Sequence, residues 1–151
     1  MRLKKIITAS IIAITLLSCS GELKQADYRV IPLPKEITLS TTEDPFVISK
    51  NVSIAYPESQ SELSKEASFL SEYLNEILGY SLKVEVVDNI KRNAINLIIN
   101  PSLFTENDAY KIIVNKDNIQ IIGSNTQSIF YAIQTLRKSL PFDAEGEKVS
   151  M

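Results

Sequence analysis

The chain has 151 residues, of which 44% are hydrophobic and 23% are charged, and its formal net charge is -2. One hydrophobic core suffices for this length, so we expect a single folded domain. The absence of histidine excludes Ser-His-Asp triads, Cys-His pairs and histidine-based zinc sites. Beyond residue 18 there are 13 basic and 18 acidic residues, and a mildly acidic body without a basic stripe predicts no nucleic-acid partner.

The N-terminal segment has the pattern of an export signal. Three basic residues, Arg2, Lys4 and Lys5, precede an apolar run from residue 6 to residue 17. A membrane-spanning helix needs about 20 apolar residues, so this shorter run is typical of a signal peptide instead. We therefore predict a lipoprotein signal peptide over residues 1–18.

Cys19 is the single cysteine, which rules out an intramolecular disulfide. The stretch Leu16-Leu17-Ser18-Cys19 resembles a bacterial lipobox, in which a small residue precedes a cysteine that is lipidated. The resemblance implies lipidation at Cys19, a lipidated tether over residues 19–28, and an exported protein anchored to the bacterial cell envelope. The expected location is the outer membrane, on its periplasmic or surface side. The alternative is a plain secretory signal in which the cysteine is incidental.

The first elements expected after the tether are extended. Prolines 32 and 34 restrict their own backbone and that of the preceding residues, so residues 29–34 are predicted as an edge strand or its lead-in. Residues 46–48 and residues 52–56 are predicted as two short strands, because the second alternates as a half-buried strand does. A turn over residues 49–51 separates them.

The middle of the chain predicts a helix followed by strands. Residues 61–78 carry apolar side chains at three- and four-residue steps, which is typical of an amphipathic helix. Ser61 is the candidate N-cap, and Gly79 suits the left-handed conformation that ends a helix. Residues 82–86 alternate strictly and predict a strand, and residues 94–100 are apolar enough for a central strand that Pro101 ends.

The last elements predict a hairpin and a second helix. Residues 110–114 and residues 118–122 flank a polar turn and should pair. Ser124 or Asn125 can cap a helix that continues to Pro141. The element order favours an α+β fold, with an antiparallel or mixed β-sheet and two helices packed on one face. The polar residues 142–151 are expected to begin a linker.

Three stretches of the sequence, taken in order, point to one family. They are Val30-Ile31-Pro32-Leu33-Pro34-Lys35-Glu36, the hairpin strands with their flanks (residues 109–114 and 119–123), and Ile129-Phe130-Tyr131-Ala132-Ile133-Gln134-Thr135-Leu136-Arg137. Together they resemble the N-terminal, non-catalytic domain of bacterial β-N-acetylhexosaminidases of glycoside hydrolase family 20. Ala132 and Ser128 depart from this pattern, because relatives commonly have glycine there. Packing explains the stretch 129–137. Phe130 and Leu136 are expected to face the sheet. Gln134 and Thr135 are expected to bind neighbouring backbone or, in relatives, the following barrel.

The resemblance implies an accessory domain over residues 29–141, followed by a linker to a catalytic barrel that these 151 residues do not include. In this family an Asp-Glu pair of the barrel assists attack by the substrate's own acetamido group. We therefore assign no catalytic, cofactor-binding or metal-ligating residue and expect the chain alone to be inactive. The sequence's own acidic clusters are expected to be solvated loop charges: Glu43 with Asp44, Glu106 with Asp108, and Asp143 with Glu145 and Glu147.

The expected parent protein is an exo-acting β-N-acetylhexosaminidase that hydrolyses terminal N-acetylhexosamine residues. Its barrel would pack against this domain, and the lipid anchor would hold the protein on a membrane. Two alternatives remain open. The chain could be a free-standing lipoprotein module that binds glycans or a protein, or it could be the front domain of another glycosidase such as an α-glucuronidase.

Overall fold

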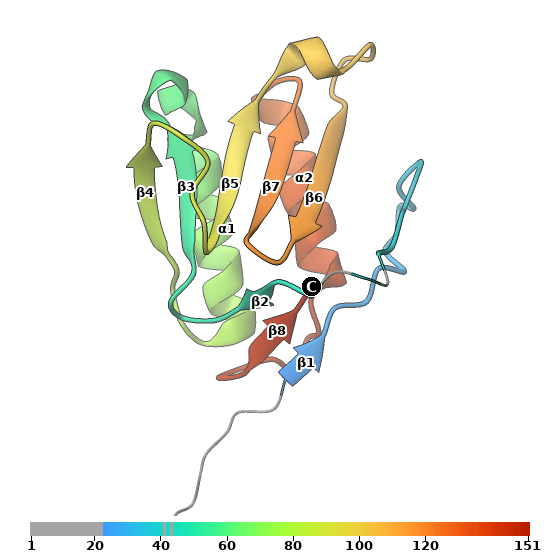
Figure 1. Ribbon diagram of the computed structural model, residues 1–151, viewed down its shortest axis with the longest axis vertical. Coiled ribbons are helices and arrows are strands. Elements are labelled where there is room, and N and C mark those ends of the chain that lie inside the picture. The colour runs from blue at the N-terminus through green and yellow to red at the C-terminus, as the bar shows by residue number, and fades with distance from the viewer. Residues whose placement is uncertain (1–22, 41, 43) are drawn as a thin grey trace, which may run out of the picture.

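The computed structural model describes residues 23–151 apart from residues 41 and 43. This part of the chain forms a larger sheet, two helices behind it, and a smaller sheet beside one end of them (Figure 1). The predicted signal peptide and Cys19 lie outside the described residues. No helix of the described part is long and apolar enough to cross a bilayer.

The larger sheet is built from β3 (Ser53–Pro57), β4 (Lys83–Val87), β5 (Ala94–Ile99), β6 (Tyr110–Asn115) and β7 (Asn118–Gly123). Its strand order is β4-β3-β5-β7-β6, and every neighbouring pair from β4 to β7 is parallel. The β6–β7 pair is antiparallel because a two-residue turn joins the strands, as predicted. The sheet is mixed and β5 lies at its centre, which confirms both expectations.

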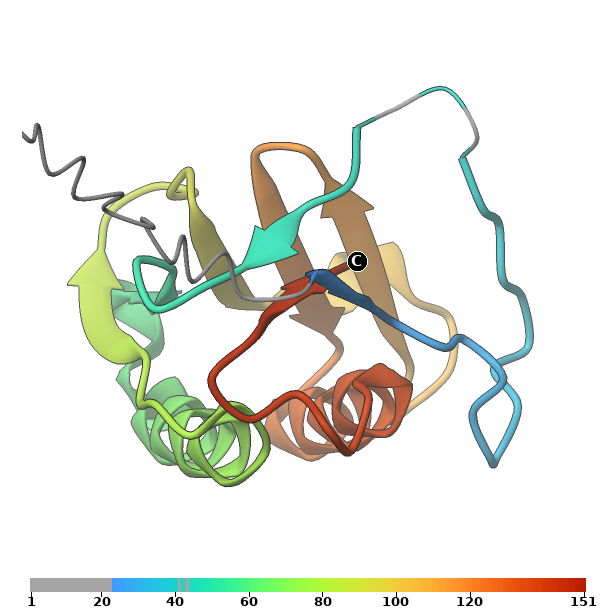
Figure 2. The ribbon, with the colours of Figure 1, turned by 90° about the horizontal axis from the view of Figure 1, so that it is seen from below.

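Two helices cover one face of this sheet. α1 (Ser64–Leu78) follows a 3-10 helix, η1 (Glu58–Leu63), and α2 (Thr126–Ser139) follows β7. They lie side by side on the same face, which confirms the predicted α+β arrangement (Figure 2). Because α1 carries the chain from β3 back to the same end of the sheet, β4 pairs with β3 in parallel.

Local chemistry explains the end of α1 and the start of α2. Gly79 has a φ of 71° and ends α1 in the left-handed conformation, as predicted. Asn125 caps α2 by accepting a bond from the Ser128 amide at 2.9 Å, and the Ser128 hydroxyl accepts from the Asn125 amide at 3.0 Å. The N-cap predicted at Ser61 is wrong. The 3-10 helix runs directly into α1, so Ser61 lies inside it and Leu63 takes the cap position without a side-chain bond.

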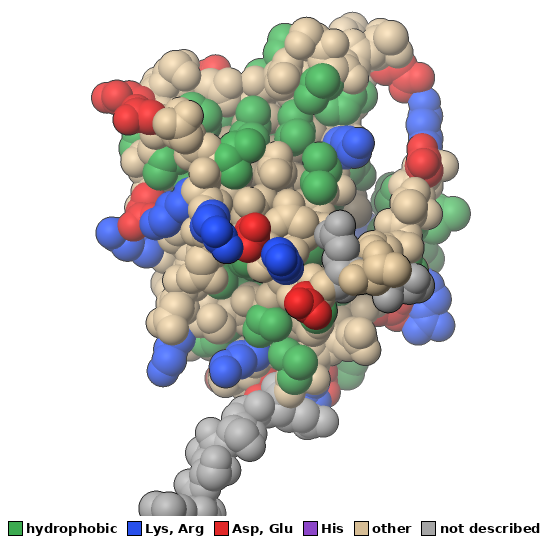
Figure 3. All heavy atoms as spheres, in the orientation of Figure 1, with side chains coloured by type: hydrophobic (Ala, Val, Ile, Leu, Met, Phe, Trp, Pro, Cys, Tyr) green, Lys and Arg blue, Asp and Glu red, His purple; other side chains and the backbone are tan. Residues whose placement is uncertain are grey.

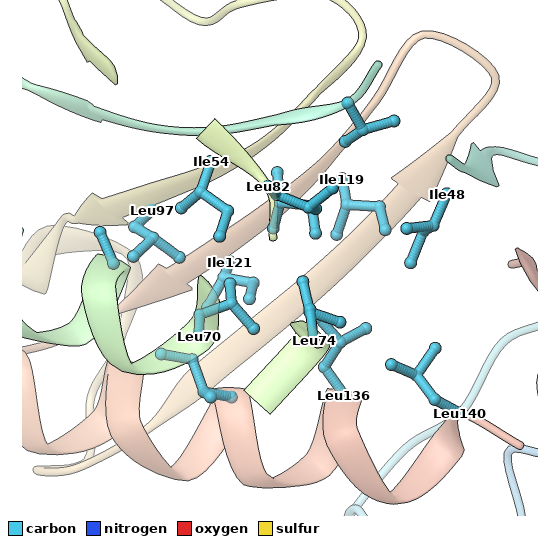
Figure 4. Packing of buried hydrophobic residues seen from close by; sticks show 14 of the residues in the cluster. Ile48, Ile54, Leu70, Leu74, Leu82, Leu97, Ile119, Ile121, Leu136 and Leu140 are labelled. Atoms are coloured by element: carbon cyan, nitrogen blue, oxygen red, sulfur yellow. The ribbon is translucent and has the colours of Figure 1, made fainter. Parts of the chain in front are cut away.

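The hydrophobic core lies between the larger sheet and the helices (Figure 4). Strand residues such as Ile54, Leu97 and Ile121 meet Leu70 of α1 and Leu136 of α2. All five are fully or almost fully buried. Their burial fixes the helices against the sheet and leaves the opposite sheet face free of helices.

The smaller sheet joins segments from both ends of the described chain. It contains β1 (Leu23–Gln25), β8 (Lys148–Ser150) and β2 (Val47–Ile48) in the order β1-β8-β2. β1 runs parallel to β8, and β2 runs antiparallel to it. The chain therefore enters and leaves the fold through adjacent strands.

These strands correct two expected boundaries. The described part of the expected tether, residues 23–28, is held on the body, where the Ala26 amide donates to the Ser150 carbonyl at 2.9 Å. The expected linker, residues 142–151, returns to the fold and buries Met151. Strands of three residues carry too little periodicity to be recognised, and their partners lie more than a hundred residues away in the sequence.

The edge strand predicted for residues 29–34 does not form in this structure. Instead residues 31–40, which we call the arm, leave the body after the buried Val30 and extend away from the larger sheet (Figure 2). The chain returns at the buried Phe46. Two prolines of the arm lack the amide hydrogen that a strand ladder needs, and the Ile31–Pro32 peptide bond is cis.

Candidate functional site

The acidic clusters of the sequence do not form a paired carboxylate site in the part that the structure describes. Glu106 is exposed and accepts bonds from Lys35 at 2.7 and 2.8 Å. Asp108 accepts a bond from a side-chain amide at 2.8 Å. Asp44 is exposed, and its neighbour Glu43 lies outside the described residues. These carboxylates behave as loop charges.

The acidic residues near the C-terminal end are also dispersed. Asp143 pairs with Lys24 at 3.1 Å, and this hydrogen bond lowers the pKa of the Asp143 carboxyl. Glu145 is exposed, whereas one carboxylate oxygen of Glu147 is buried without a hydrogen-bond partner. These three side chains thus serve different contacts.

Two carboxylates that pair with cations have pKa values too low for acid catalysis. The Arg29 guanidinium lowers the pKa of Asp27 to about 2, and hydrogen bonds from Lys83 and Lys91 lower that of Glu85 to about 2. A general acid needs a pKa raised toward neutrality, so both groups are charged partners instead. Among the described residues, no three Cys, Asp or Glu side chains gather as metal ligands would.

The two helices share a group of ring side chains, which we call the aromatic cluster: Phe69, Tyr73, Phe130 and Tyr131. Phe69 lies 4.2 Å from Tyr73 and 5.3 Å from Phe130 between ring centroids. The Arg137 guanidinium lies 4.2 Å above the Tyr73 ring, in cation–π contact. Phe130 was predicted to face the sheet, and this is wrong. It stacks on Phe69 across the helix pair and is only partly buried.

The polar residues of the same α2 stretch bind the side chains of neighbouring elements. The Thr135 hydroxyl lies 2.6 Å from the Tyr110 hydroxyl of β6, and the Gln134 amide donates to the Tyr73 hydroxyl at 3.5 Å. Leu136 is buried in the core, as predicted. This stretch therefore acts by packing, and its partners Tyr73 and Tyr110 could not be found from spacing because they lie on other elements.

A groove of about 290 Å³ lies between the base of the arm and α2. Lys138 spans its edge and donates to the Ile31 carbonyl at 2.5 Å. The groove is lined by Val30, Ile31, Pro32, Tyr110, Tyr131, Gln134, Thr135 and Lys138. Through Tyr131 it adjoins the aromatic cluster, so the base of the arm and the outer side of α2 form one continuous, largely apolar surface.

A second hollow follows the exposed edge strand β4 and has a volume of about 460 Å³. Glu85 lies in it and is paired with Lys83 at 2.7 Å and with Lys91. On this open face of the sheet, a band of basic and acidic side chains crosses below a hydrophobic area (Figure 3). Charges along an edge strand discourage pairing with another chain, which is the role we assign to this ion group.

The described residues thus define a packing or docking domain. Their carboxylates either pair with cations or lie apart from one another. The polar side chains of the α2 stretch, Gln134 and Thr135, bind other side chains of the fold. Their hollows are shallow. The sequence pointed to no catalytic residue, and the structure adds a feature that spacing did not reveal, namely the partly exposed surface made by the base of the arm and the aromatic cluster.

Residues 27–151 match the model described as glycosyl hydrolase family 20, domain 2. This chain belongs to that family, as its resemblance implied.

The chain spans only about a fifth of the length of the relatives that it matches. A beta-hexosaminidase of Porphyromonas gingivalis is 29% identical over 140 residues, which are 88% of this chain and 18% of that protein. The structure of the GH20 β-N-acetylhexosaminidase from Streptomyces coelicolor A3(2) matches with a TM-score of 0.66 and 24% identity, over 78% of this chain and 22% of that chain. A β-N-acetylhexosaminidase from Bacteroides fragilis matches with a TM-score of 0.58 and 17% identity, over 82% and 23%. Both solved structures share the fold of this chain over the matched part.

Proposed function

We propose that this chain is the accessory domain that precedes the catalytic barrel of an exo-acting β-N-acetylhexosaminidase. The match of residues 27–151 to domain 2 of family 20 carries this proposal. The Porphyromonas gingivalis relative supports it, because the stretch that this chain matches is only 18% of that beta-hexosaminidase. The catalytic groups that hydrolyse terminal N-acetylhexosamine residues would then belong to the barrel.

Within such an enzyme the domain's work is to pack against the barrel. The aromatic cluster suits this task, because its rings are only partly buried and Tyr131 is exposed on the outer side of α2. Exposed aromatic side chains contribute large apolar areas to interfaces. Arg137 lies over Tyr73 and adds a cation that an interface can desolvate.

The activity test compares two lengths of the protein. Genomic DNA read beyond the codon for Met151 is expected to continue into a barrel of roughly 250 residues with an Asp-Glu pair. The longer product should hydrolyse a chromogenic N-acetylglucosaminide, and purified residues 20–151 should leave it intact because they hold no catalytic pair. Specific turnover by residues 20–151 would refute the assignment of chemistry to the barrel, and an inactive long product would refute the parent enzyme.

We further propose that Cys19 carries lipid and holds the protein on the bacterial cell envelope, at the outer membrane on its periplasmic or surface side. The basic start, the short apolar run and Leu16-Leu17-Ser18-Cys19 support this proposal. β1 begins at Leu23, four residues after the cysteine, so the fold would begin at most about 14 Å from the lipidated residue. The domain would then sit close to the membrane surface.

Metabolic labelling tests the anchor. Cells that express the protein are grown with a clickable fatty acid, and the protein is expected to take up the label and to fractionate with membranes. Cys19→Ala removes the acceptor sulfur and should abolish the label, whereas Ser20→Ala is the matched control and should keep it. An unlabelled wild type, or a label that survives Cys19→Ala, would contradict the proposal.

A further inference from the structure

The arm is apolar and uncovered at the same time. Its aliphatic side chains are highly exposed, at 81% for Ile31, 73% for Leu33, 43% for Ile37 and 63% for Leu39. All four have odd numbers, and an extended chain turns odd- and even-numbered side chains to opposite sides. The arm therefore carries aliphatic side chains at alternate positions, which we call its apolar side, and each of them is at least 43% exposed. Contiguous exposed apolar surface of this kind marks an interaction site.

Two lysine contacts link the arm to the body. Lys138 of α2 donates to the Ile31 carbonyl at 2.5 Å, and Lys35 pairs with Glu106 at 2.7 Å. Both members of the second pair are more than half exposed, and such pairs contribute little to stability. The contacts seen in the structure thus position the arm and leave its apolar side available.

The end of the chain lies at the root of the arm. Where the arm returns to the fold, the Phe46 amide donates to the Met151 carbonyl at 3.2 Å, and the Met151 amide donates to the Phe46 carbonyl at 2.8 Å. At the other root, Ile31 and Pro32 line the groove that adjoins Tyr131 of the aromatic cluster. A domain that follows Met151 would start beside the segment through which the arm returns to the fold.

We propose that the apolar side of the arm packs against the catalytic barrel and forms one interface with the aromatic cluster. This inference rests on the proposed function, because the barrel is its occupant. A membrane is a poorer partner for the arm. Lys35, the one cation among residues 31–40, is paired with Glu106, and Glu36 adds a negative charge, whereas anionic lipid surfaces attract clusters of Lys and Arg.

Hydrogen exchange in the complete gene product tests the arm directly. If the barrel covers the arm, amides of residues 33–40 are expected to exchange at least about tenfold more slowly than an unstructured peptide of the same sequence. Exchange at the unstructured rate, in a product shown by mass to contain the barrel and by assay to be active, would overturn the inference and leave the proposed function intact. A product without a barrel would overturn both.

A variant pair locates the contact. Leu33→Ser with Leu39→Ser removes apolar side chains of the arm, and Ile90→Ser with Leu103→Ser removes two side chains of similar exposure, 53% and 59%, that lie elsewhere. The arm variant is expected to speed exchange both in the arm and in barrel peptides, and the control should leave both unchanged. Faster exchange in the arm and β6 alone would mean that the arm folds back on its own sheet. Protection that arises only on lipid vesicles would mean a membrane partner, and either result overturns the inference.

Discussion

Ile121→Ala is expected to lower the free energy of unfolding by about 2–5 kcal/mol. Ile121 lies on β7, is completely buried, and pairs in register with Leu97 of β5 and Ile112 of β6. Its side chain meets the helices near Leu70 (Figure 4). Sheet and helices are both anchored at this position, so they cannot readily close the cavity that alanine would leave.

This loss is large compared with the total stability of a small domain, which is about 5–15 kcal/mol. Urea denaturation of residues 20–151, followed by circular dichroism, measures the change. Ile90→Ala is the matched control, because Ile90 is 53% exposed on the β4–β5 loop and its loss should change stability by less than about 0.5 kcal/mol. Equal midpoints for the two variants would contradict the position of the core.

Gly123→Ala is expected to destabilise the fold by about 1–3 kcal/mol, because the end of β7 is packed against the start of α2. A methyl group at Gly123 would lie 2.3 Å from the Ser128 hydroxyl oxygen and 3.0 Å from the Ile129 amide nitrogen. The Ser128 hydroxyl cannot move away without losing its bonds to the amide and carbonyl of Asn125, at 3.0 and 2.7 Å. The added methyl therefore disturbs the capping box.

A double-mutant cycle separates this clash from a general effect of alanine. Ser128→Gly removes the hydroxyl that a methyl group at residue 123 would meet, so Gly123→Ala should cost less in the Ser128→Gly background than in the wild type. The expected coupling is on the order of 1 kcal/mol, measured by urea denaturation of the four proteins. If the losses of unfolding free energy in the two single variants simply add up in the double variant, the close approach to Ser128 is not the reason that Gly123→Ala is destabilising.

The position of the two chain ends matters for any longer protein. β1 and β8 run in the same direction, so a chain that arrives from an anchor through Leu23 and leaves at Met151 would travel away from the membrane. Under the proposed function, the barrel would begin on the side of the domain that lies farther from the lipid. The small sheet would then act as the joint between anchor and enzyme.

The amino-acid sequence by itself determined the elements whose signals are local. The periodicity of residues 61–78 identified α1, and Gly79 marked its end. Ser124 or Asn125 marked the start of α2, and the structure has Asn125 as the cap. The β6–β7 hairpin could be identified because a short polar turn separates two segments rich in apolar residues. The family followed from the order of these same motifs.

Only the tertiary structure decided the features that depend on residues far apart in the chain. The parallel pairing of β3, β4, β5 and β7 depends on the connections that return the chain to the same end of the sheet, such as α1 between β3 and β4, and no local pattern specifies where these connections lead. The β1–β8 pair joins segments separated by more than a hundred residues, each too short to show a period. Phe130 does not face the sheet. Its ring stacks on Phe69 of the neighbouring helix, a contact that depends on how the two helices pack. The exposure of the arm's aliphatic side chains likewise depends on where the rest of the chain packs, so the sequence alone could not show it.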